Sequence, residues 1–522
     1  MHDFDIVIIG CGPVGGAAAN LLGRAGLNVL VVEKQIDPYP LPRAVHIDHE
    51  IMRILQSAGI VDGFEPLTRA TQGHLHIGAD GDVLRYLGTA GLARRFGWSN
   101  DYFFYQPELE ALLRERLLAM PNVTLWTGTS FVGLEQDEAG VTLDLTRADG
   151  DVKVRVAHVI ACDGASSPIR TALDVPLIDL DFEEPWLVVD VEMDDRVTFP
   201  IFPGLPIGAD VQQLSVMLCD PRRPTTIVPG RGNHRRWEFM LLPGESDEAM
   251  RAPDRVAALV APWIAGVPHK IIRAATYRFH GLVAERWQVG RVFLAGDAAH
   301  QTPPFFGQGM CHGMRDVASL AWKLALVHRG IASKRLLDGY QSEREPQVRA
   351  VISAAIEAGK YICELNPVAA AERDRVIRQR EATRTVHTAA DLISPITGLV
   401  LATSTGAGER FIQPRIMDSQ GRSYLLDDVT DSGLRLFVTG GLAVEPASVE
   451  VFERVGGAVV SVAELNSGEL DAWFAAHDAV AVLVRPDFYV FGTARTPADI
   501  AHLVDAFDTG VGASTVPGAM AA

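Results

Sequence analysis

The stretch DFDIVIIGCGPVGGAAANLLGRAGLNVLVVEK, residues 3–34, constrains the fold more than any other part of the chain. It predicts a strand, a glycine turn, a helix and a second strand. Gly10, Gly12 and Gly15 form a GxGxxG motif, which permits a tight turn, close approach to a pyrophosphate, and close helix–strand packing. Glu33 ends the second strand, where a carboxylate can accept hydrogen bonds from ribose hydroxyls. A Rossmann-like dinucleotide-binding unit is therefore predicted, although this motif alone does not separate FAD from NAD.

Two later segments repeat the pattern of an apolar strand that runs into an acid and a glycine. The first is HVIACDGASSPIRTAL, residues 158–173, with Asp163 at the end of the strand. The second is RVFLAGDAAHQTPPFFGQGM, residues 291–310, with Asp297 at the corresponding place. A helical pattern follows from about Cys311 to Val327.

Taken together, GxGxxG, DGxxSxxR and GDAAHxxPPxxGQGM resemble the fingerprints of single-component flavoprotein aromatic hydroxylases, the group A FAD monooxygenases. The resemblance covers about the first 400 residues and implies an FAD-binding domain of the p-hydroxybenzoate hydroxylase type. It also implies FAD as cofactor, with NADH or NADPH as a transient co-substrate and O2 as oxidant. A flavin halogenase would require a WxWxIP motif, which the sequence lacks. An ordinary NAD dehydrogenase would leave the second and third fingerprints without a role, and a non-catalytic flavin-binding module is a remote alternative.

The resemblance also assigns roles to individual residues around the flavin. It implies that Asp297 accepts hydrogen bonds from the ribityl chain, while Pro303 and Pro304 form a rigid wall beside the isoalloxazine. The helix that follows would direct its positive end at the flavin N1 and C2 carbonyl region. Ser167 and Arg170 are read as structural supports of their turn. The complete set of expected cofactor contacts is Gly10, Gly12, Gly15, Glu33, Arg43, Gln106, Asp163, Asp297, Pro304, Gly307, Gly309 and Met310.

The order of strand and helix patterns predicts an α/β protein with three domains, of which the FAD-binding domain is discontinuous in sequence. Residues 1–176 and 280–400 are assigned to the FAD-binding domain, and 177–279, with alternating strand patterns, to an inserted antiparallel β-sheet domain for the substrate. Residues 408–522 resemble the thioredoxin-like C-terminal domain of the phenol and polyketide hydroxylase branch. That segment has no cysteine, so it cannot perform thiol–disulfide exchange, and a structural or oligomerisation role is expected.

The inserted region and the GQGMCHGM segment resemble the 3-(3-hydroxyphenyl)propionate hydroxylase group. This resemblance implies ortho-hydroxylation of a phenol through a flavin C4a-hydroperoxide, with a larger polyketide-type aromatic as the alternative substrate. A base near the phenol would help, and His46 is the candidate, with a packed or flavin-orienting role as its alternative. His300 is read as a structural loop residue and His312 as a weaker candidate. A substrate carboxylate would need one of four cations in the inserted region, Arg222, Arg223, Arg235 and Arg236.

Charge and cysteine content limit the partners. The formal net charge of −18 argues against a nucleic-acid partner, because such a surface needs clustered lysine and arginine. The five cysteines form no CxxC pair, so neither a metal site nor a disulfide framework is expected. No sufficiently long apolar run predicts a membrane span. These features lead us to expect a cytoplasmic protein. The resemblance implies a small phenolic substrate, and a homodimer is the assembly that we expect.

Overall fold

The computed structural model describes residues 3–89, 91–194, 196–381 and 392–512. The first sheet has its strands in the order β17-β18-β11-β1-β2-β8, with β9 and β10 extending it from β11. Its central strands β18, β11, β1, β2 and β8 run parallel. The strands of this sheet are β1 (Phe4–Ile9), β2 (Val29–Val32), β8 (Val123–Trp126), β9 (Ser130–Gln136), β10 (Val141–Arg147), β11 (Gly150–Ala161), β17 (Gln288–Val289) and β18 (Val292–Leu294). This arrangement confirms the predicted Rossmann-like unit.

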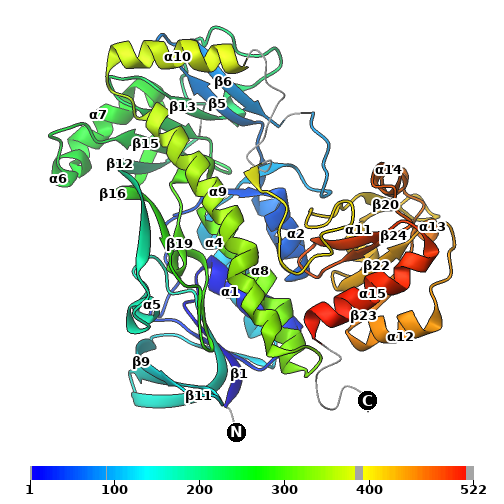
Figure 1. The fold of residues 1–522 in the computed structure, drawn as a ribbon. Helices are drawn as coiled ribbons and strands as arrows, with labels where there is room; N and C mark the ends of the chain where they lie inside the picture. Colours follow the sequence, from blue (N-terminus) through cyan, green and yellow to red (C-terminus); the bar gives the residue numbers. More distant parts are fainter. Residues whose placement is uncertain (1–2, 90, 195, 382–391, 513–522) are drawn as a thin grey trace.

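Helices cover the first sheet and connect it to the rest of the molecule. Helix α1 packs against both α4 and α8, and the long α8 and α9 run through the middle of the molecule (Figure 1). The buried face of α1 is rich in alanine and glycine, which lets its neighbours pack closely against it. The helices are α1 (Pro13–Arg24), α2 (His49–Ser57), α3 (Val61–Phe64), α4 (Gln106–Leu118), α5 (Pro168–Ala172), α8 (Gly309–His328), α9 (Gly339–Ile362) and α10 (Pro367–Glu381).

The second sheet is the wall of the predicted substrate domain. Its order is β19-β16-β12-β15-β14-β13-β5-β6, and the long strands β12 and β16 carry the chain away from the first sheet and back (Figure 1). Helices α6 (Asp247–Arg251) and α7 (Pro253–Ile264) cover its outer face. Its strands are β5 (Gly73–Ile77), β6 (Val83–Gly88), β12 (Leu177–Met193), β13 (Ser215–Leu218), β14 (Thr225–Val228), β15 (His234–Met240), β16 (His269–Ala284) and β19 (His300–Gln301).

The second sheet is not built from the insert alone. Strands β5 and β6 come from residues 73–88, which the sequence analysis assigned to the FAD-binding segment, and β5 pairs in parallel with β13. The remaining pairs of this sheet are antiparallel. A small third sheet comes from the same part of the sequence as β5 and β6. Its strands, in order, are β3 (His46–Asp48), β7 (Asp101–Phe103) and β4 (Arg69–Ala70). The wall is therefore built from segments on both sides of β11.

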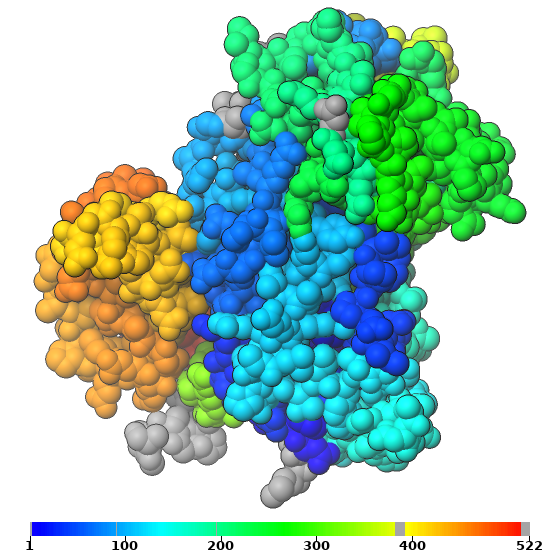
Figure 2. Space-filling model, turned by 180° about the vertical axis from the view of Figure 1, so that it is seen from behind, coloured from blue at the N-terminus to red at the C-terminus, as the bar shows by residue number. Residues whose placement is uncertain are grey.

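The C-terminal part forms a lobe beside the FAD-binding domain (Figure 2). Its sheet has the order β23-β22-β24-β25, with β22–β23 parallel and the other pairs antiparallel. One face packs on α12, α15 and the Trp322 end of α8, and the other packs on α13 and α14. The elements are β20 (Arg415–Met417), β21 (Ser423–Leu425), β22 (Leu434–Val438), β23 (Gly457–Ser461), β24 (Ala481–Val484), β25 (Val490–Ala494), α11 (Leu426–Thr430), α12 (Pro446–Arg454), α13 (Val462–Leu465), α14 (Gly468–Ala476) and α15 (Pro497–Val511).

Across the described residues, none of the helices combines the length and the hydropathy needed to cross a bilayer. The largest hydrophobic core joins the first sheet, the α1–α8 pair and the inner face of the second sheet. The site predicted from sequence therefore lies where these elements meet.

Candidate active site

The glycine loop between β1 and α1 has the geometry that a bound pyrophosphate requires. Gly10 has φ +98°, and a Cβ built there would lie 2.3 Å from the carbonyl oxygen of Cys162. A Cβ on Gly15 would lie 1.9 Å from the carbonyl oxygen of Gly10, whereas a Cβ on Gly12 would meet nothing within 4 Å. Helix α1 has no side-chain cap and no acid in its first turn. Its amides are therefore available to an anion beside Gly12.

Glu33 is tied to this loop. Its carboxylate accepts the backbone N–H of Cys11 at 2.7 Å and that of Gln35 at 2.9 Å. The side chain is half-buried at the end of β2, as the sequence predicts. It thus lies beside the glycine loop, where the resemblance implies a contact with the adenosine ribose.

Asp163 and Asp297 follow adjacent parallel strands, β11 and β18. Asp163 accepts the N–H of Ile169 with Oδ2 at 3.1 Å, while its Oδ1 is buried without a hydrogen-bond partner among the described residues. Burial raises the pKa of this carboxyl above its ordinary value. The Asp297 side chain is exposed, yet the protein surrounding it is dense enough to raise its pKa by desolvation. An orphaned carboxylate oxygen and an accessible acid deep in the protein fit a polar group such as the FAD ribityl chain.

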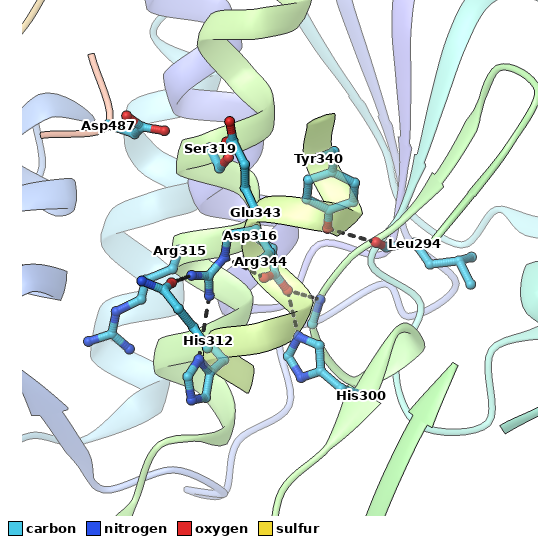
Figure 3. Close-up of polar contacts among 12 residues, drawn as sticks. Leu294, His300, His312, Arg315, Asp316, Ser319, Tyr340, Glu343, Arg344 and Asp487 are labelled. Atoms are coloured by element: carbon cyan, nitrogen blue, oxygen red, sulfur yellow. Dashed lines mark hydrogen bonds and ion pairs between the residues drawn. The ribbon is translucent and has the colours of Figure 1, made fainter. Parts of the chain in front are cut away.

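The loop that carries Asp297 is held by an acid that sequence reasoning missed. Asp316 of α8 accepts the N–H of Gly296 at 3.1 Å and faces Nε2 of His300 at 2.7 Å (Figure 3). Its other oxygen accepts a bond from Nε of Arg344 at 3.1 Å. All three side chains are buried, and His300 thus supports the loop. The available signal was that Asp316 is the only acid of this helix, and a buried acid is costly unless it is paired.

The GQGM segment places the beginning of α8 at the site. Gly307 has φ +63°, and a Cβ there would lie 2.8 Å from Nδ1 of His46. Gln308 donates to Asp48 at 3.1 Å and accepts from Arg315 at 3.0 Å, so both ends of its amide are fixed. Helix α8 begins at Gly309, two residues before the predicted start, and lacks a side-chain cap. Its free amides can stabilise negative charge, and the half-buried Pro304 and Met310 lie in the same segment.

Arg43 and Gln106 are linked in an unexpected way. The side-chain oxygen of Gln106 accepts the backbone N–H groups of Arg43 at 3.2 Å and Ala44 at 2.7 Å. Its nitrogen donates to Glu110 at 2.7 Å. The Arg43 side chain is exposed, with its guanidinium carbon 4.6 Å from the ring centroid of Tyr39. Gln106 therefore positions the Arg43 loop, and a direct contact with flavin stays a prediction.

His46 is buried and has an acceptor at each ring nitrogen. Nε2 lies 2.8 Å from a carboxylate oxygen of Asp101, and Nδ1 lies 3.4 Å from the carbonyl oxygen of Gly307. Burial lowers its pKa, but the bonds with Asp101 and Cys311 outweigh this and hold it well above the ordinary value. With both nitrogens donating, the imidazolium has no lone pair for a substrate proton. The predicted role of His46 as a base thus requires it to release one of these partners.

The four arginines considered for a substrate carboxylate all have protein partners. Arg236 donates to Asp190 at 2.8 Å and to the backbone carbonyls of Arg43 at 2.6 Å and Pro42 at 2.9 Å. It therefore fastens the Arg43 loop to the second sheet. The other three pair with an acid or with nearby carbonyls, namely Arg222 with Asp220, Arg223 with Glu245, and Arg235 with the carbonyls of Gly232 and His234.

Replacing Asp297 with alanine should weaken FAD binding. A hydrogen bond to a charged group contributes about 1.5–3 kcal/mol, which corresponds to an increase in the FAD Kd of roughly 10- to 150-fold. Fluorescence titration of the deflavinated protein with FAD measures this change. Asp220→Ala, which removes an exposed ion pair with Arg222 and a bond from the backbone N–H of Arg222, is the control and should bind FAD like the parent. If Asp297→Ala binds FAD as tightly as the parent does, the proposed contact between Asp297 and the ribityl chain is wrong.

Comparison with known proteins agrees with this geometry. A family model described as the FAD binding domain matches residues 3–355, and the HcaD C-terminal domain family matches residues 408–510. The chain is 34% identical to a probable NADH-specific resorcinol 4-hydroxylase of Rhodococcus jostii, covering 96% of this chain and 93% of that protein. It is also 34% identical to a 3-(3-hydroxy-phenyl)propionate/3-hydroxycinnamic acid hydroxylase of Burkholderia cenocepacia, covering 93% of each.

Solved structures show the same fold over nearly the whole chain. The OxyS anhydrotetracycline hydroxylase of Streptomyces rimosus aligns with a TM-score of 0.80 at 25% identity, covering 98% of this chain and 99% of that one. Aklavinone-11 hydroxylase, in complex with FAD and aklavinone, aligns with a TM-score of 0.79 at 23% identity, covering 98% of this chain and 99% of that one. The glycine loop, the two strand-end acids and the uncapped α8 meet at one place in a fold shared with these enzymes. The chain belongs to the family of FAD-dependent aromatic hydroxylases.

Proposed function

We propose that this enzyme uses NADH and O2 to hydroxylate a simple phenol at the carbon ortho to its hydroxyl, with 3-(3-hydroxyphenyl)propionate and resorcinol as the first substrates to test. The observation that carries the proposal is identity of 34% over nearly the whole chain with enzymes named for these two phenols. The geometry of the glycine loop, Asp163, Asp297 and α8 supports FAD as the bound group. Bound FAD would accept a hydride from NADH and activate O2.

Residues of the chain would hold this chemistry in place. The N-terminus of α1 would bind the pyrophosphate, and Asp297 the ribityl hydroxyls. The uncapped N-terminus of α8 would stabilise the negative charge of the reduced ring. Phe305 of the Pro-rich loop packs against Trp186 and Phe279 of the second sheet at ring-centroid distances of 6.0 Å. This aromatic cluster would keep water away from the reacting oxygen and so limit loss of oxidant as peroxide.

A larger polyketide-type aromatic is the second candidate. It is favoured by the fold likeness to anhydrotetracycline hydroxylase, whose TM-score of 0.80 spans 98% of this chain. We also infer a cytoplasmic homodimer from the sequence, and light scattering of the purified holoenzyme measures the assembly.

The test measures NADH oxidation and product by the purified FAD-loaded enzyme in aerated buffer. We expect 3-(3-hydroxyphenyl)propionate or resorcinol to accelerate flavin reduction and to yield one ortho-hydroxylated product per NADH. If neither phenol accelerates flavin reduction, or if peroxide is the only product, the larger aromatic becomes the favoured substrate. A matched run with NADPH determines the nicotinamide preference.

A further inference from the structure

Glu238 lies on the face of the second sheet that is turned toward the FAD-binding domain. Every second cross-strand pair along β12 and β15 faces the same side, and three such pairs are Trp186 with Met240, Val188 with Glu238, and Asp190 with Arg236. Val188 and Met240 belong to the core that includes the first sheet, whereas the alternate residues of these strands pack under α6 and α7. The Glu238 side chain therefore points toward the flavin side.

The two neighbouring pairs contact the two loops that flank the expected flavin ring. On one side, Trp186 packs on Phe305 of the Pro-rich loop at a ring-centroid distance of 6.0 Å. On the other side, Arg236 donates to the backbone carbonyls of Pro42 and Arg43 at 2.9 and 2.6 Å. Glu238 is the middle position of this row, so its carboxyl lies on the wall between the Pro-rich loop and the Arg43 loop.

The carboxyl of Glu238 is half-buried and has no hydrogen bond or ion pair among the residues that the structure describes. Its cross-strand neighbour on β14 is Thr226, whose hydroxyl is buried and also lacks a partner there. Two strands further on, His74 of β5 is buried with both ring nitrogens unpartnered in the described chain. Unpaired buried polar groups are uncommon. Those of Thr226 and His74, on the face that also carries the half-buried Glu238, point to a polar ligand beside them.

We propose that Glu238 binds the phenolic hydroxyl of the substrate and removes its proton before the oxygen transfer. The O–H bond breaks, its electron pair stays on the phenolate oxygen, and the proton forms the neutral carboxylic acid of Glu238. The phenolate is richer in electrons at its ortho carbons than the phenol, so it reacts faster with an electrophilic oxygen. This inference rests on the proposed function and gives Glu238 the role that the sequence suggested for His46.

The charges around Glu238 suit this role. Burial raises its pKa to about 7, opposed by Arg236 on its own strand and reinforced by Asp190 on β12. Strand β14 presents Thr226 and Val228, which do not titrate near neutrality. On β5, burial lowers the pKa of His74 to about 4 and that of His76 well below its ordinary value, so both are neutral there. A base that titrates near the working pH is efficient, and His46 is already held by Asp101.

The FAD-loaded Glu238→Gln variant tests the proposal with 3-(3-hydroxyphenyl)propionate as the probe. Flavin reduction by NADH should continue, while product formation should fall by roughly 10²- to 10⁴-fold and peroxide should replace the product. The parent's rate should rise with pH through about 7, because the base must lose its proton, and the variant should lack this step. Glu183→Gln is the matched control and should behave like the parent. Glu183 is an exposed acid of the neighbouring strand β12, near Arg278 of β16.

A more acidic, ring-fluorinated analogue of the probe separates a base from a structural residue. It arrives partly ionised, so it should restore much of the activity of Glu238→Gln, which a loss of packing would not allow. Parent-like rate and pH profile in Glu238→Gln, or equal loss with both phenols, would overturn the proposal. Loss of turnover in His46→Ala, combined with a parent-like Glu238→Gln, would return the base to His46. If the parent enzyme hydroxylates neither phenol, the proposed function fails first, independently of Glu238.

Discussion

Replacement of Gly15 by alanine is expected to destabilise the FAD-binding domain severely. The new methyl carbon would lie 1.9 Å from the carbonyl oxygen of Gly10 and 3.3 Å from Cβ of Cys162. Overpacking commonly costs about 1–3 kcal/mol when side chains can move aside. Here the obstacle is the backbone between β1 and α1, so the cost should exceed about 3 kcal/mol, a large part of a total stability of roughly 5–15 kcal/mol. Soluble yield, circular dichroism and the thermal midpoint measure the loss.

Gly12 supplies a matched control three residues earlier. Its φ is −74°, which alanine also adopts, and its Cβ position meets nothing within 4 Å. Gly12→Ala should therefore keep the circular dichroism spectrum and thermal midpoint of the FAD-free parent. Its methyl group would occupy the approach of the pyrophosphate, so FAD affinity should fall by at least about tenfold. A parent-like midpoint for Gly15→Ala, or parent-like FAD affinity for Gly12→Ala, would contradict the assigned geometry of the loop.

Replacement of Glu343 by glutamine is expected to destabilise the whole enzyme by about 3–5 kcal/mol, the cost of breaking a buried ion pair. Glu343 of α9 accepts bonds from Lys323 of α8 at 2.5 Å and from Arg485 of the C-terminal lobe at 2.7 Å. All three residues are at most 1% exposed. With a neutral amide at position 343, Asp487 would be the one acid left among the described residues of this network to balance the charges of Lys323 and Arg485. Asp487 accepts a bond from Arg485 at 2.6 Å. Urea denaturation of the FAD-loaded protein measures the change.

The pH dependence of stability supplies a second readout for the same residue. Burial raises the pKa of Glu343, but Arg485 and Lys323 overcome this effect and lower it from 4.5 to about 2. A depressed pKa contributes stability above pH 4.5, and this contribution is lost as the pH falls toward 2. Glu343→Gln should be less sensitive to acid in that window. Glu345→Gln, two residues along α9 and paired with Arg349, is the control and should cost less than about 1 kcal/mol. Equal stability of the two variants would contradict the assigned importance of the network.

The flavin unit could be predicted because its signals are local. Gly10, Gly12 and Gly15, and the acids at the ends of β11 and β18, lie in short motifs whose spacing fixes their geometry. What could not be predicted depends on contacts between distant residues. The pairing of His46 with Asp101 joins positions 55 apart, so the sequence does not indicate that the His46 ring is already held by an acid.

The substrate wall shows the same division. The alternating strands of the insert were recognisable, but the addition of β5 depends on its parallel pairing with β13, more than a hundred residues away in the chain. Arg236 resembled a ligand for a carboxylate, yet folding places its guanidinium against Asp190 and the Pro42–Arg43 carbonyls. Glu238 stood unremarked in the same segment, because an ordinary glutamate becomes notable only when its carboxyl is surrounded by protein without a partner.

The composite origin of the second sheet determines how specificity can be exchanged between relatives. A chimaera that transfers only residues 177–284 would have to pair β13 of one enzyme with β5 of another in a parallel register. His74 and His76 would stay behind, although they belong to the same wall as Glu238. Recombination should therefore succeed only when crossovers transfer residues 73–88 together with the insert, because the second sheet is encoded in two separate stretches of the gene.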